Sequence, residues 1–422
     1  MSNPTFGFPP EIFDLIFTMV ILLPERTCHI EIPSLVVTQV CRHWRTLAHS
    51  IPKFWCHLLI NAGQPDVTFL DEQVSRSNDL PLSVRLYAED EDISEAAITF
   101  VLKHQDRIDS LCLDGLHNLF SRFSTRINSK RIKEIHFHSE EWPKKSPIKF
   151  GITPQRVRLE AVPFEDIDIK WTEVSSMHIH SVGVNGAMPR LDKVTGLKSL
   201  ALVLDGWEPQ DNGAIVVNNS IEELSLNGSC DAEIVITTMS LPSLKTLDIK
   251  IADLTNCSEG LCRFLQGCDL KSIHVRECWE YLHLDDGVAT AALIAVLDIT
   301  RSLQKLTIGP QEVSKRLLPR LLDPNCLTPR LQTLSLSAHF NSDDNPSDFI
   351  SSCLDVIESR ESLDLTLTLT FDQEGHDLPK NIEDRMEAMR AEGKKITIIS
   401  DVSHDELDDG SDDEESEDEL FF

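Results

Sequence analysis

Side chains that are able to do chemistry recur in pairs, two residues apart, along three short segments of the chain. The pairs are His136 and His138, Arg156 and Arg158, and His178 and His180. In an extended strand such residues point to the same side, so each pair would present both side chains on one face. Arginine pairs bind carboxylate and phosphate groups, and paired histidines can ligate metal ions, although no closed ligand set is evident here. The simplest interpretation is that all six are solvated strand residues.

The three segments belong to a short apolar pattern that recurs along much of the chain. The pattern is apolar-x-x-apolar-x-apolar, and its copies begin at residues 108, 132, 174, 197, 221, 244, 270, 303 and 331, with a weak copy at 154. Neighbouring copies begin 20 to 33 residues apart. Each copy predicts a strand whose second and third apolar residues point into a core. Repetition at this spacing predicts a parallel curved sheet with helices or loops outside it.

The residues between and beside the inward positions would face the concave side of that sheet. The part between residues 136 and 180 is rich in His and Arg, within a strongly acidic protein. Such a face would suit an acidic or phosphorylated segment of another protein. The candidate substrate-binding residues are His136, His138, Arg156, Arg158, His178, His180, Lys250, His274 and Arg276.

The first sixty residues predict a small pair of helices. One helix begins at Pro9 and Pro10, where a missing N–H costs nothing, and stops at Pro24. A second is predicted over residues 35–49, with Ser34 as its cap. Two helices bury little of their own apolar surface. They either pack on the next domain as an ordinary hairpin or give an apolar face to a partner.

Three motifs occur in order within this helical stretch, from about residue 6 to residue 58. They are Phe8-Pro9-Pro10-Glu11-Ile12, then Val40-Cys41-Arg42-His43-Trp44, then Phe54-Trp55. The stretch resembles the F-box, which opens with Leu-Pro-x-Glu-Ile/Leu, carries Val-Cys-Arg-x-Trp in a later helix and closes near Leu-Trp. Phe8 replaces the usual Leu, and the loop over residues 24–34 is longer than in the compact form, as in fungal F-box proteins. Several motifs in the right order are more specific than any one alone.

This resemblance implies a role in an SCF ubiquitin ligase. An F-box docks on a Skp-type adaptor, the adaptor holds a cullin scaffold, and the rest of the chain holds an unknown protein substrate. The motif positions that would face or support the adaptor are Phe8, Pro9, Pro10, Ile12, Leu15, Ile16, Val40, Cys41 and Trp44. Trp44 also suits a purely intramolecular core. The downstream pattern resembles the divergent leucine-rich repeats that often follow an F-box. The alternative is a repeat scaffold that no longer recruits a ligase.

The charge of the chain is strongly acidic, with a net value of −30. Residues 401–422 hold 12 acidic residues and no Lys or Arg, which leaves −18 for the remainder. Because phosphate backbones require a basic surface, this balance argues against a nucleic-acid binder. The acidic run predicts a disordered tail. Ser411 and Ser416 are followed by acidic residues and are candidate phosphorylation sites.

The 11 cysteines are odd in number and share no repeated spacing. We see no secretory signal and no membrane-spanning run, so reduced thiols in the cytosol or nucleus are expected. The densest cysteine group, over residues 257–278, does not have zinc-module spacing. We find no catalytic constellation, glycine-rich phosphate loop or metal motif, and we expect a non-enzymatic protein without a cofactor.

These observations predict an α/β fold with four successive regions. Residues 1–60 form a small helical F-box-like domain, and residues 61–107 form the first strand and helix region of a solenoid. Residues 108–400 form the divergent repeats, and residues 401–422 form the tail. Helical connectors are expected at 258–265 and 289–299. The end of the repeats is expected as a strand over 362–371, a helix over 381–392 and a strand over 395–400.

Overall fold

The computed structural model shows an α/β protein in which parallel strands alternate with helices. The chain divides into two compact units, Met1–Leu270 and Lys271–Phe422. No helix in the described residues is long and apolar enough to cross a membrane. The structure describes residues 12, 13, 15, 16, 33–63, 65–88, 94–115, 117–139, 147–182, 191, 194–205, 216–227, 232–250, 257–276, 286–309, 311–323, 327–340, 346–360, 362–371 and 378–402.

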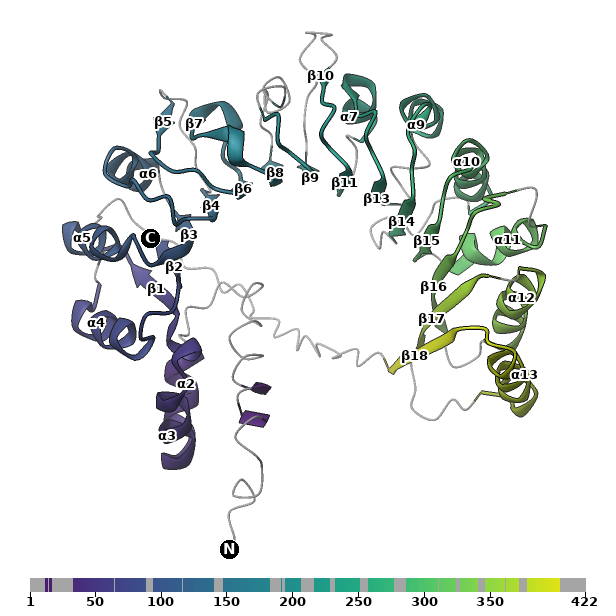
Figure 1. Cartoon of the computed structure of the whole chain (residues 1–422), viewed down its shortest axis with the longest axis horizontal. Coiled ribbons are helices and arrows are strands. Elements are labelled where there is room, and N and C mark those ends of the chain that lie inside the picture. The colour runs from purple at the N-terminus through teal and green to yellow at the C-terminus, as the bar shows by residue number, and fades with distance from the viewer. Residues whose placement is uncertain are drawn as a thin grey trace, which may run out of the picture. The chain divides into compact units, whose positions relative to one another are not determined.

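The first unit is organised around a parallel sheet whose spatial order follows the order of the chain (Figure 1). Its strands are, from one edge, β1 (His57–Asn61), β2 (Leu82–Tyr87), β3 (Ile108–Asp114), β4 (Glu134–His138), β6 (Arg156–Glu160), β8 (Ser176–Val182), β9 (Ser199–Asp205), β11 (Glu223–Leu226) and β13 (Thr246–Lys250). Two short ribbons accompany it, formed by β5 (Ile148–Lys149) with β7 (Ile167–Asp168) and by β10 (Val216–Val217) with β12 (Met239–Ser240).

The helices of this unit fall into two groups. At the N-terminal end lie α2 (Pro33–Val40), α3 (Arg42–Ser50) and the 3-10 turn η3 (Pro52–Trp55). Between the strands lie α4 (Val67–Arg76), α5 (Glu95–His104), α6 (His117–Ser124), the 3-10 turns η4 (Phe164–Asp166) and η5 (Trp171–Glu173), α7 (Ala232–Thr238) and α9 (Ser258–Leu265). Figure 1 shows the connecting helices on one side of the sheet. Side-chain caps start two of them, because Asp66 accepts a hydrogen bond from Phe69 N and Ser94 accepts one from Ala96 N.

The apolar pattern read from the sequence forms the core of the sheet. In β4, Ile135 and Phe137 are buried, and their register partners in β6, Val157 and Leu159, are buried as well. The copy that looked weak, beginning at residue 154, therefore makes the regular strand β6. The same alternation recurs from β1 to β13. Alternate residues point to opposite faces, so the polar residues of these strands lie on the side away from the core.

A recurring backbone contact sets the spacing of the strands. The carbonyl oxygen of Lys133, just before β4, accepts hydrogen bonds from the N–H groups of Gln155 and Arg156 at 2.7 and 2.9 Å. The carbonyl of Ser175 does the same for Lys198 and Ser199, at 2.8 and 3.0 Å. Copies of this shared-carbonyl contact recur further along the first unit and in the second. Because each copy fixes where the next strand begins, successive strands start in register.

The second unit repeats the same architecture. Its parallel strands are, in order, β14 (Ser272–Arg276), β15 (Lys305–Ile308), β16 (Thr333–Phe340), β17 (Asp364–Phe371) and β18 (Ile396–Val402). Its helices are α10 (Asp286–Ile299), α11 (Gln311–Leu321), α12 (Pro346–Ser359) and α13 (Lys380–Ala391). Arg360 is buried, and its guanidinium donates to the backbone carbonyls of Leu321, Leu327 and Thr328, each at 3.0 Å. These bonds satisfy a charge that would otherwise be costly to bury.

Three details of the predicted boundaries need correction. The helix predicted over 35–49 is two helices, because Cys41 has extended dihedrals (φ −160°, ψ 171°) and cannot continue a helix. Instead its Sγ accepts a hydrogen bond from Trp44 N at 3.5 Å and caps α3. The last strand pairs with β17 through Val402, so the first two residues of the predicted disordered tail are strand. The sheet begins with β1, most of which lies inside the helical domain predicted for residues 1–60.

The predicted connectors at 258–265 and 289–299 are confirmed as α9 and as most of α10. The expected strand, helix and strand at the end of the repeats correspond to β17, α13 and β18. Five further helices, α5, α6, α7, α11 and α12, had no prediction.

Candidate functional site

The structure places the three pairs of His and Arg residues on neighbouring strands. β4, β6 and β8 are adjacent in the sheet, and His136, Arg158 and His178 are direct register partners. One step further along the strands, a second row runs through His138, Glu160 and His180. We call the surface that these rows form, together with the outward residues of β2 and β3, the polar face. Its members are Arg85, Cys112, Asp114, Glu134, His136, His138, Arg156, Arg158, Glu160, His178 and His180.

Glu160 is the centre of the first network on the polar face. Its Oε1 accepts a hydrogen bond from Nε of Arg158 at 2.7 Å and lies 2.5 Å from Nη2 of the same guanidinium, and its Oε2 lies 3.1 Å from Nε2 of His136. Partial burial acts to raise the pKa of Glu160, but the hydrogen bond and charge of His136 and the charge of Arg158 outweigh it and hold the pKa at about 2. The carboxylate is therefore ionised at neutral pH and orients both partners.

Asp114 has the same role on β3, which is separated from β6 by β4. Its Oδ2 accepts from Nη2 and Nε of Arg85 at 2.5 and 3.2 Å, and its Oδ1 lies 2.6 Å from Nδ1 of His138. Burial acts to raise the pKa of Asp114, and the hydrogen bonds from His138 and Arg85 outweigh it, so the pKa lies below its usual value. Asp114 and Glu160 thus each bridge one guanidinium and one imidazole.

The charges of the polar face are balanced in pairs. The third arginine, Arg156, donates to Oε2 of Glu134 from Nη2 at 2.7 Å and from Nε at 3.3 Å. Each of these arginines therefore has a carboxylate partner on the same face. On the next strand the two rows continue into Ala201 and Val203 of β9, so the cationic part of the face ends at β8.

His178 stays uncharged at neutral pH. Burial and the charge of the nearby Arg158 lower its pKa to about 4. Its place beside Arg158 in the row accounts for the effect of that charge. This imidazole therefore adds a polar but neutral group to the face.

The register also assembles a chain of three groups that the sequence did not reveal. Nδ1 of His136 lies 3.3 Å from Sγ of Cys112, while its Nε2 lies close to Glu160. A thiol, an imidazole and a carboxylate in this order are the components of a nucleophile with its base and orienting group. Burial, however, raises the pKa of Cys112 to about 12, so the thiol stays protonated and is a poor nucleophile. The arrangement therefore serves to orient His136.

Only the spacing in three dimensions reveals this chain of groups, because Cys112 and His136 lie 24 residues apart in the sequence. Cys112 is one of the outward positions of the repeat pattern, and a search along each row of the pattern is the signal that would have found it. Among the residues that the structure describes, no group of three or more His, Cys, Asp or Glu side chains is arranged to hold a metal ion.

The remaining candidates of the predicted binding face are not members of this cluster. Lys250 ends β13, three strands beyond β8 in the sheet. His274 and Arg276 lie on β14, which belongs to the second unit. The six residues between 136 and 180 are therefore the ones that the fold brings together.

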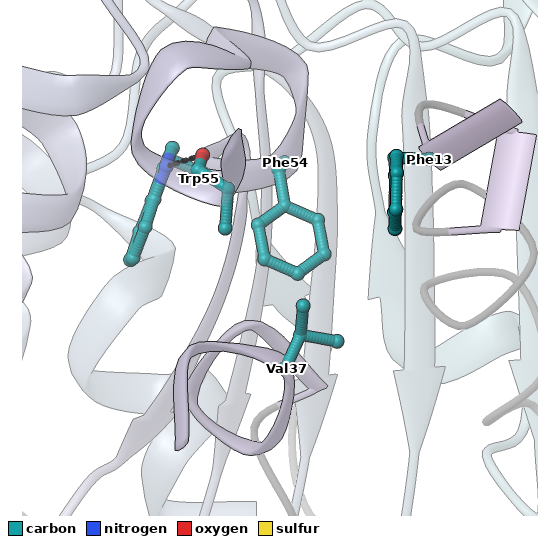
Figure 2. Close-up of a cluster of buried hydrophobic side chains, with 5 residues drawn as sticks. Phe13, Val37, Phe54 and Trp55 are labelled. Atoms are coloured by element: carbon teal, nitrogen blue, oxygen red, sulfur yellow. Dashed lines mark hydrogen bonds between the residues drawn. The ribbon is translucent and has the colours of Figure 1, made fainter. Parts of the chain in front are cut away.

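The N-terminal helices form a small separate core within the first unit. Phe13, Val37, Ala48, Phe54 and Trp55 are buried together. Figure 2 shows Val37, Phe54 and Trp55 with Phe13 on its own short segment. The ring of Phe13 lies 5.9 Å from that of Trp44 in an edge-to-face arrangement, which joins the segment around residues 12–16 to α3.

Among the described residues of this N-terminal helical unit, several large apolar side chains are exposed. Leu15 and Val40 are 57% and 58% exposed, and Ile12 and Ile16 are exposed as well. Ile12, Leu15 and Ile16 are helical and share one face by their spacing. Phe13, between them, points into the core.

The other predicted adaptor-binding residues have different positions. Trp44 is partly buried and packs against the small core, and Cys41 is the cap of α3. Phe8, Pro9 and Pro10 lie outside the described residues, as do Ser411 and Ser416.

A cluster around Trp55 joins the helical unit to the sheet. The indole Nε1 donates to the Ala48 carbonyl at 2.8 Å, and the guanidinium of Arg76 in α4 lies 4.5 Å from the centre of the Trp55 ring. Arg76 also contacts His49 of α3, with 2.8 Å between Nη1 and Nε2. Burial and the Arg76 charge lower the pKa of His49, which favours a neutral imidazole at this contact. The helices are thus held to α4 by side chains from both sides.

Comparison with known proteins adds little to this description. No protein-family model matches the chain, and no curated protein matches it. One solved structure that matches is the crystal structure of a protein from Bacteroides fragilis, a structural genomics target. The match has 12% sequence identity and a TM-score of 0.29, and it covers 79% of this chain and 69% of that one. A TM-score this low supports no argument about fold or function.

Proposed function

We propose that this protein is the substrate-recognition subunit of an SCF-type ubiquitin ligase. In this proposal the N-terminal helical unit is an F-box that binds a Skp-type adaptor and, through it, a cullin scaffold. The strands are divergent leucine-rich repeats, and their polar face binds a protein substrate. The chain itself performs no chemistry, and its contribution is to hold the substrate near the site of ubiquitin transfer.

The observation that carries the proposal is the division of apolar residues in the helical unit. Motif positions Ile12, Leu15, Ile16 and Val40 are exposed, while the neighbouring Phe13 and Val37 are buried. A folded unit that keeps its own core and still exposes several large apolar side chains has the character of a protein-docking surface. The motif order gives that surface a candidate partner, the Skp-type adaptor.

A second observation concerns how the two binding surfaces are connected. The helical unit and the polar face belong to the same compact unit, Met1–Leu270. The contacts of Trp55 with Ala48 and Arg76 tie α3 to α4, and the carbonyl of Cys56 accepts a hydrogen bond from Ser83 of β2 at 2.9 Å. A fixed connection of this kind suits a receptor that presents its substrate at a defined distance from a ligase.

Co-purification with a Skp-type adaptor tests the proposal. The full chain is co-expressed with the adaptor as wild type and as Leu15→Glu and Val40→Glu, which place a charge at exposed positions and leave the core intact. The matched control is Val217→Glu, because Val217 is 54% exposed and lies in the same unit, on β10. We expect the wild type and Val217→Glu to co-purify with the adaptor and the other two variants to lose it.

Two outcomes would contradict the proposal. If folded wild type fails to co-purify, the chain is better described as a repeat scaffold without ligase recruitment. If Leu15→Glu and Val40→Glu bind the adaptor as well as Val217→Glu does, the exposed apolar residues are not the docking surface. Circular dichroism on each variant establishes that it is folded.

A further inference from the structure

Carboxylates and guanidinium groups lie at different depths on the polar face. The side chains of Asp114 and Glu160 are 16% and 18% exposed, whereas those of Arg85, Arg158 and Arg156 are 49%, 42% and 60% exposed. These two carboxylates are therefore recessed between the strands and the arginines stand above them, whereas Glu134, the partner of Arg156, is 40% exposed. An approaching molecule meets guanidinium groups first, although the paired charges of the face are balanced.

Each recessed carboxylate has one arginine and one histidine as partners. Glu160 accepts from Arg158 through one oxygen and lies within hydrogen-bond distance of His136 through the other. Arg158 donates Nε–H to that carboxylate and places Nη2 close to it, and a guanidinium carries more donors than these. The carboxylate thus fixes the orientation of the arginine without consuming its hydrogen-bonding capacity.

Arg156, two residues before Arg158 on β6, is also held by a carboxylate. Its Nε and Nη2 both donate to one oxygen of Glu134, which engages one edge of the guanidinium. Arg156 and Arg158 are two residues apart on β6, so their side chains leave the same face about 7 Å from each other. Two anionic side chains in an extended segment, also two residues apart, have the same separation.

The surroundings restrict what such a ligand can be. The row through Arg158 and His178 continues into Ala201, Ser225 and Asp248, so the cationic part of the face ends at β8 and is not a continuous basic track for a nucleic acid. His178, beside Arg158, is neutral at neutral pH because of its low pKa, so the positive charge here comes from the arginines. A short acidic stretch of a protein fits a patch of this size.

We propose that Arg156 and Arg158 bind an extended segment of a partner protein that carries two oxyanion side chains spaced two residues apart. The inference rests on the proposed function, in which the polar face holds the substrate, and it names the class of that substrate. Glu160 and Glu134 are positioning residues, since they orient the two guanidinium groups for bidentate contact with carboxylate or phosphate.

The test is peptide binding to the full chain, measured by fluorescence anisotropy. Three labelled peptides share one extended backbone sequence and carry Glu-x-Glu, phosphoserine-x-phosphoserine or Gln-x-Gln. The first two distinguish carboxylate from phosphate as the source of the oxyanion, and the third is uncharged. We expect at least one anionic peptide to bind, the neutral peptide to bind at least about tenfold more weakly, and the affinity to fall as salt rises.

Variants then locate the binding. Arg156→Gln and Arg158→Gln should each lower the affinity for the anionic peptide by about tenfold or more, because each removes charge-assisted hydrogen bonds. Arg158→Lys keeps the charge but loses the two parallel N–H groups of the guanidinium. Its affinity for the anionic peptide should lie between those of wild type and Arg158→Gln. The matched control is Arg263→Gln on α9, an exposed arginine of the same unit that also has a carboxylate neighbour, Glu259 at 3.6 Å. It should bind as wild type does.

The inference is overturned if neither anionic peptide binds at about millimolar concentration, if the neutral peptide binds equally well, or if Arg263→Gln weakens binding as much as the β6 variants do. Adaptor co-purification of Arg158→Gln separates this result from the proposed function. If the chain binds the adaptor but does not distinguish anionic from neutral peptides, only the proposed class of substrate is refuted. If folded wild type does not bind the adaptor, the ligase proposal is refuted, and the peptide result remains valid without it.

Discussion

The N-terminal helical unit and the polar face of the sheet differ in the chemistry of their exposed side chains. The helical unit buries a core that includes Phe13, Phe54 and Trp55, and it leaves Leu15 and Val40 exposed. The sheet buries the inward apolar residues of strand after strand, and its exposed side between β2 and β8 is polar. The same chain therefore has one surface suited to apolar contacts and another suited to charge.

The reason for the difference is the number of neighbours that each element has. A strand inside a sheet has a strand on either side and helices over one face, so all its apolar residues find cover. Two short helices and a turn have a large surface for their volume and cannot cover every apolar side chain. Apolar exposure in the helical unit is thus set by its size, and it is available for a partner.

The largest effect that separates the two regions is expected from Trp55→Ala. Trp55 fills the small core, bonds Ala48 and contacts Arg76, so its removal should lower the free energy of unfolding of the helical unit by about 3–5 kcal/mol. Because the sheet does not depend on this core, it should remain folded. Chemical denaturation, followed by hydrogen exchange for each region, measures both effects.

Trp171→Ala is the matched control for that change. Trp171 lies in a 3-10 turn, is only partly buried and contacts Phe164 at 4.4 Å between ring centres. Trp171→Ala should lower the free energy of unfolding by less than Trp55→Ala does. Equal losses for the two variants, or unfolding of the sheet with Trp55→Ala, would mean that the helical unit is not a separate core.

A smaller effect is expected from Glu160→Gln on the polar face. The change removes the charge that holds Arg158 and His136, and we expect a loss of about 2 kcal/mol at neutral pH. The folded pKa of about 2 lies below the ordinary 4.5, so the ionised carboxylate stabilises the fold above pH 4.5, and this contribution is lost as the pH falls toward 2. The difference between wild type and variant should therefore shrink in acid. Denaturant titrations at several pH values measure it.

Glu134→Gln serves as the control on the same face. Glu134 is 40% exposed and pairs only with the exposed Arg156 among the contacts we describe, so its loss should stay within about 0.5 kcal/mol. A pH-independent cost for Glu160→Gln, or a cost equal to that of Glu134→Gln, would refute the central role of Glu160.

The smallest effect on stability is expected from Leu15→Glu and Val40→Glu. Both side chains are more than half exposed, so a charge at either position should change the free energy of unfolding by no more than about 0.5 kcal/mol. Thermal unfolding measures this directly. A large loss would place these residues in the core of the helical unit and weaken the contrast with the sheet.

Much of the sheet could be predicted because the relevant signal is local. Alternation of apolar and polar residues, as in Ile135, His136, Phe137 and His138, identifies a strand and its buried side without knowledge of its neighbours. Even the copy at Pro154, which lacks one apolar residue of the pattern, proved to be a strand. The helix α5 escaped prediction because most of its residues are apolar and give little periodic contrast, whereas the apolar residues of α12 recur at helical spacing and could have been predicted.

The candidate site was only half predictable. The sequence indicated that His136 and Arg158 face the same side, but not that Glu160 joins them or that Cys112 lies beside His136. Those contacts depend on which strand is the neighbour and on the register between them. A shift of one residue would turn every side chain to the opposite face.

What the sequence alone determined is the pattern of burial: which residues of each strand enter the core, and which short helical stretch carries the ordered F-box-like motifs. Only the tertiary structure decided how the outward residues combine. The shared-carbonyl contact between Lys133 and Arg156 fixes the register of β4 and β6, and the register pairs carboxylates with the arginines. Burial follows from the chemistry of each side chain, whereas pairing follows from distances between segments far apart in the chain.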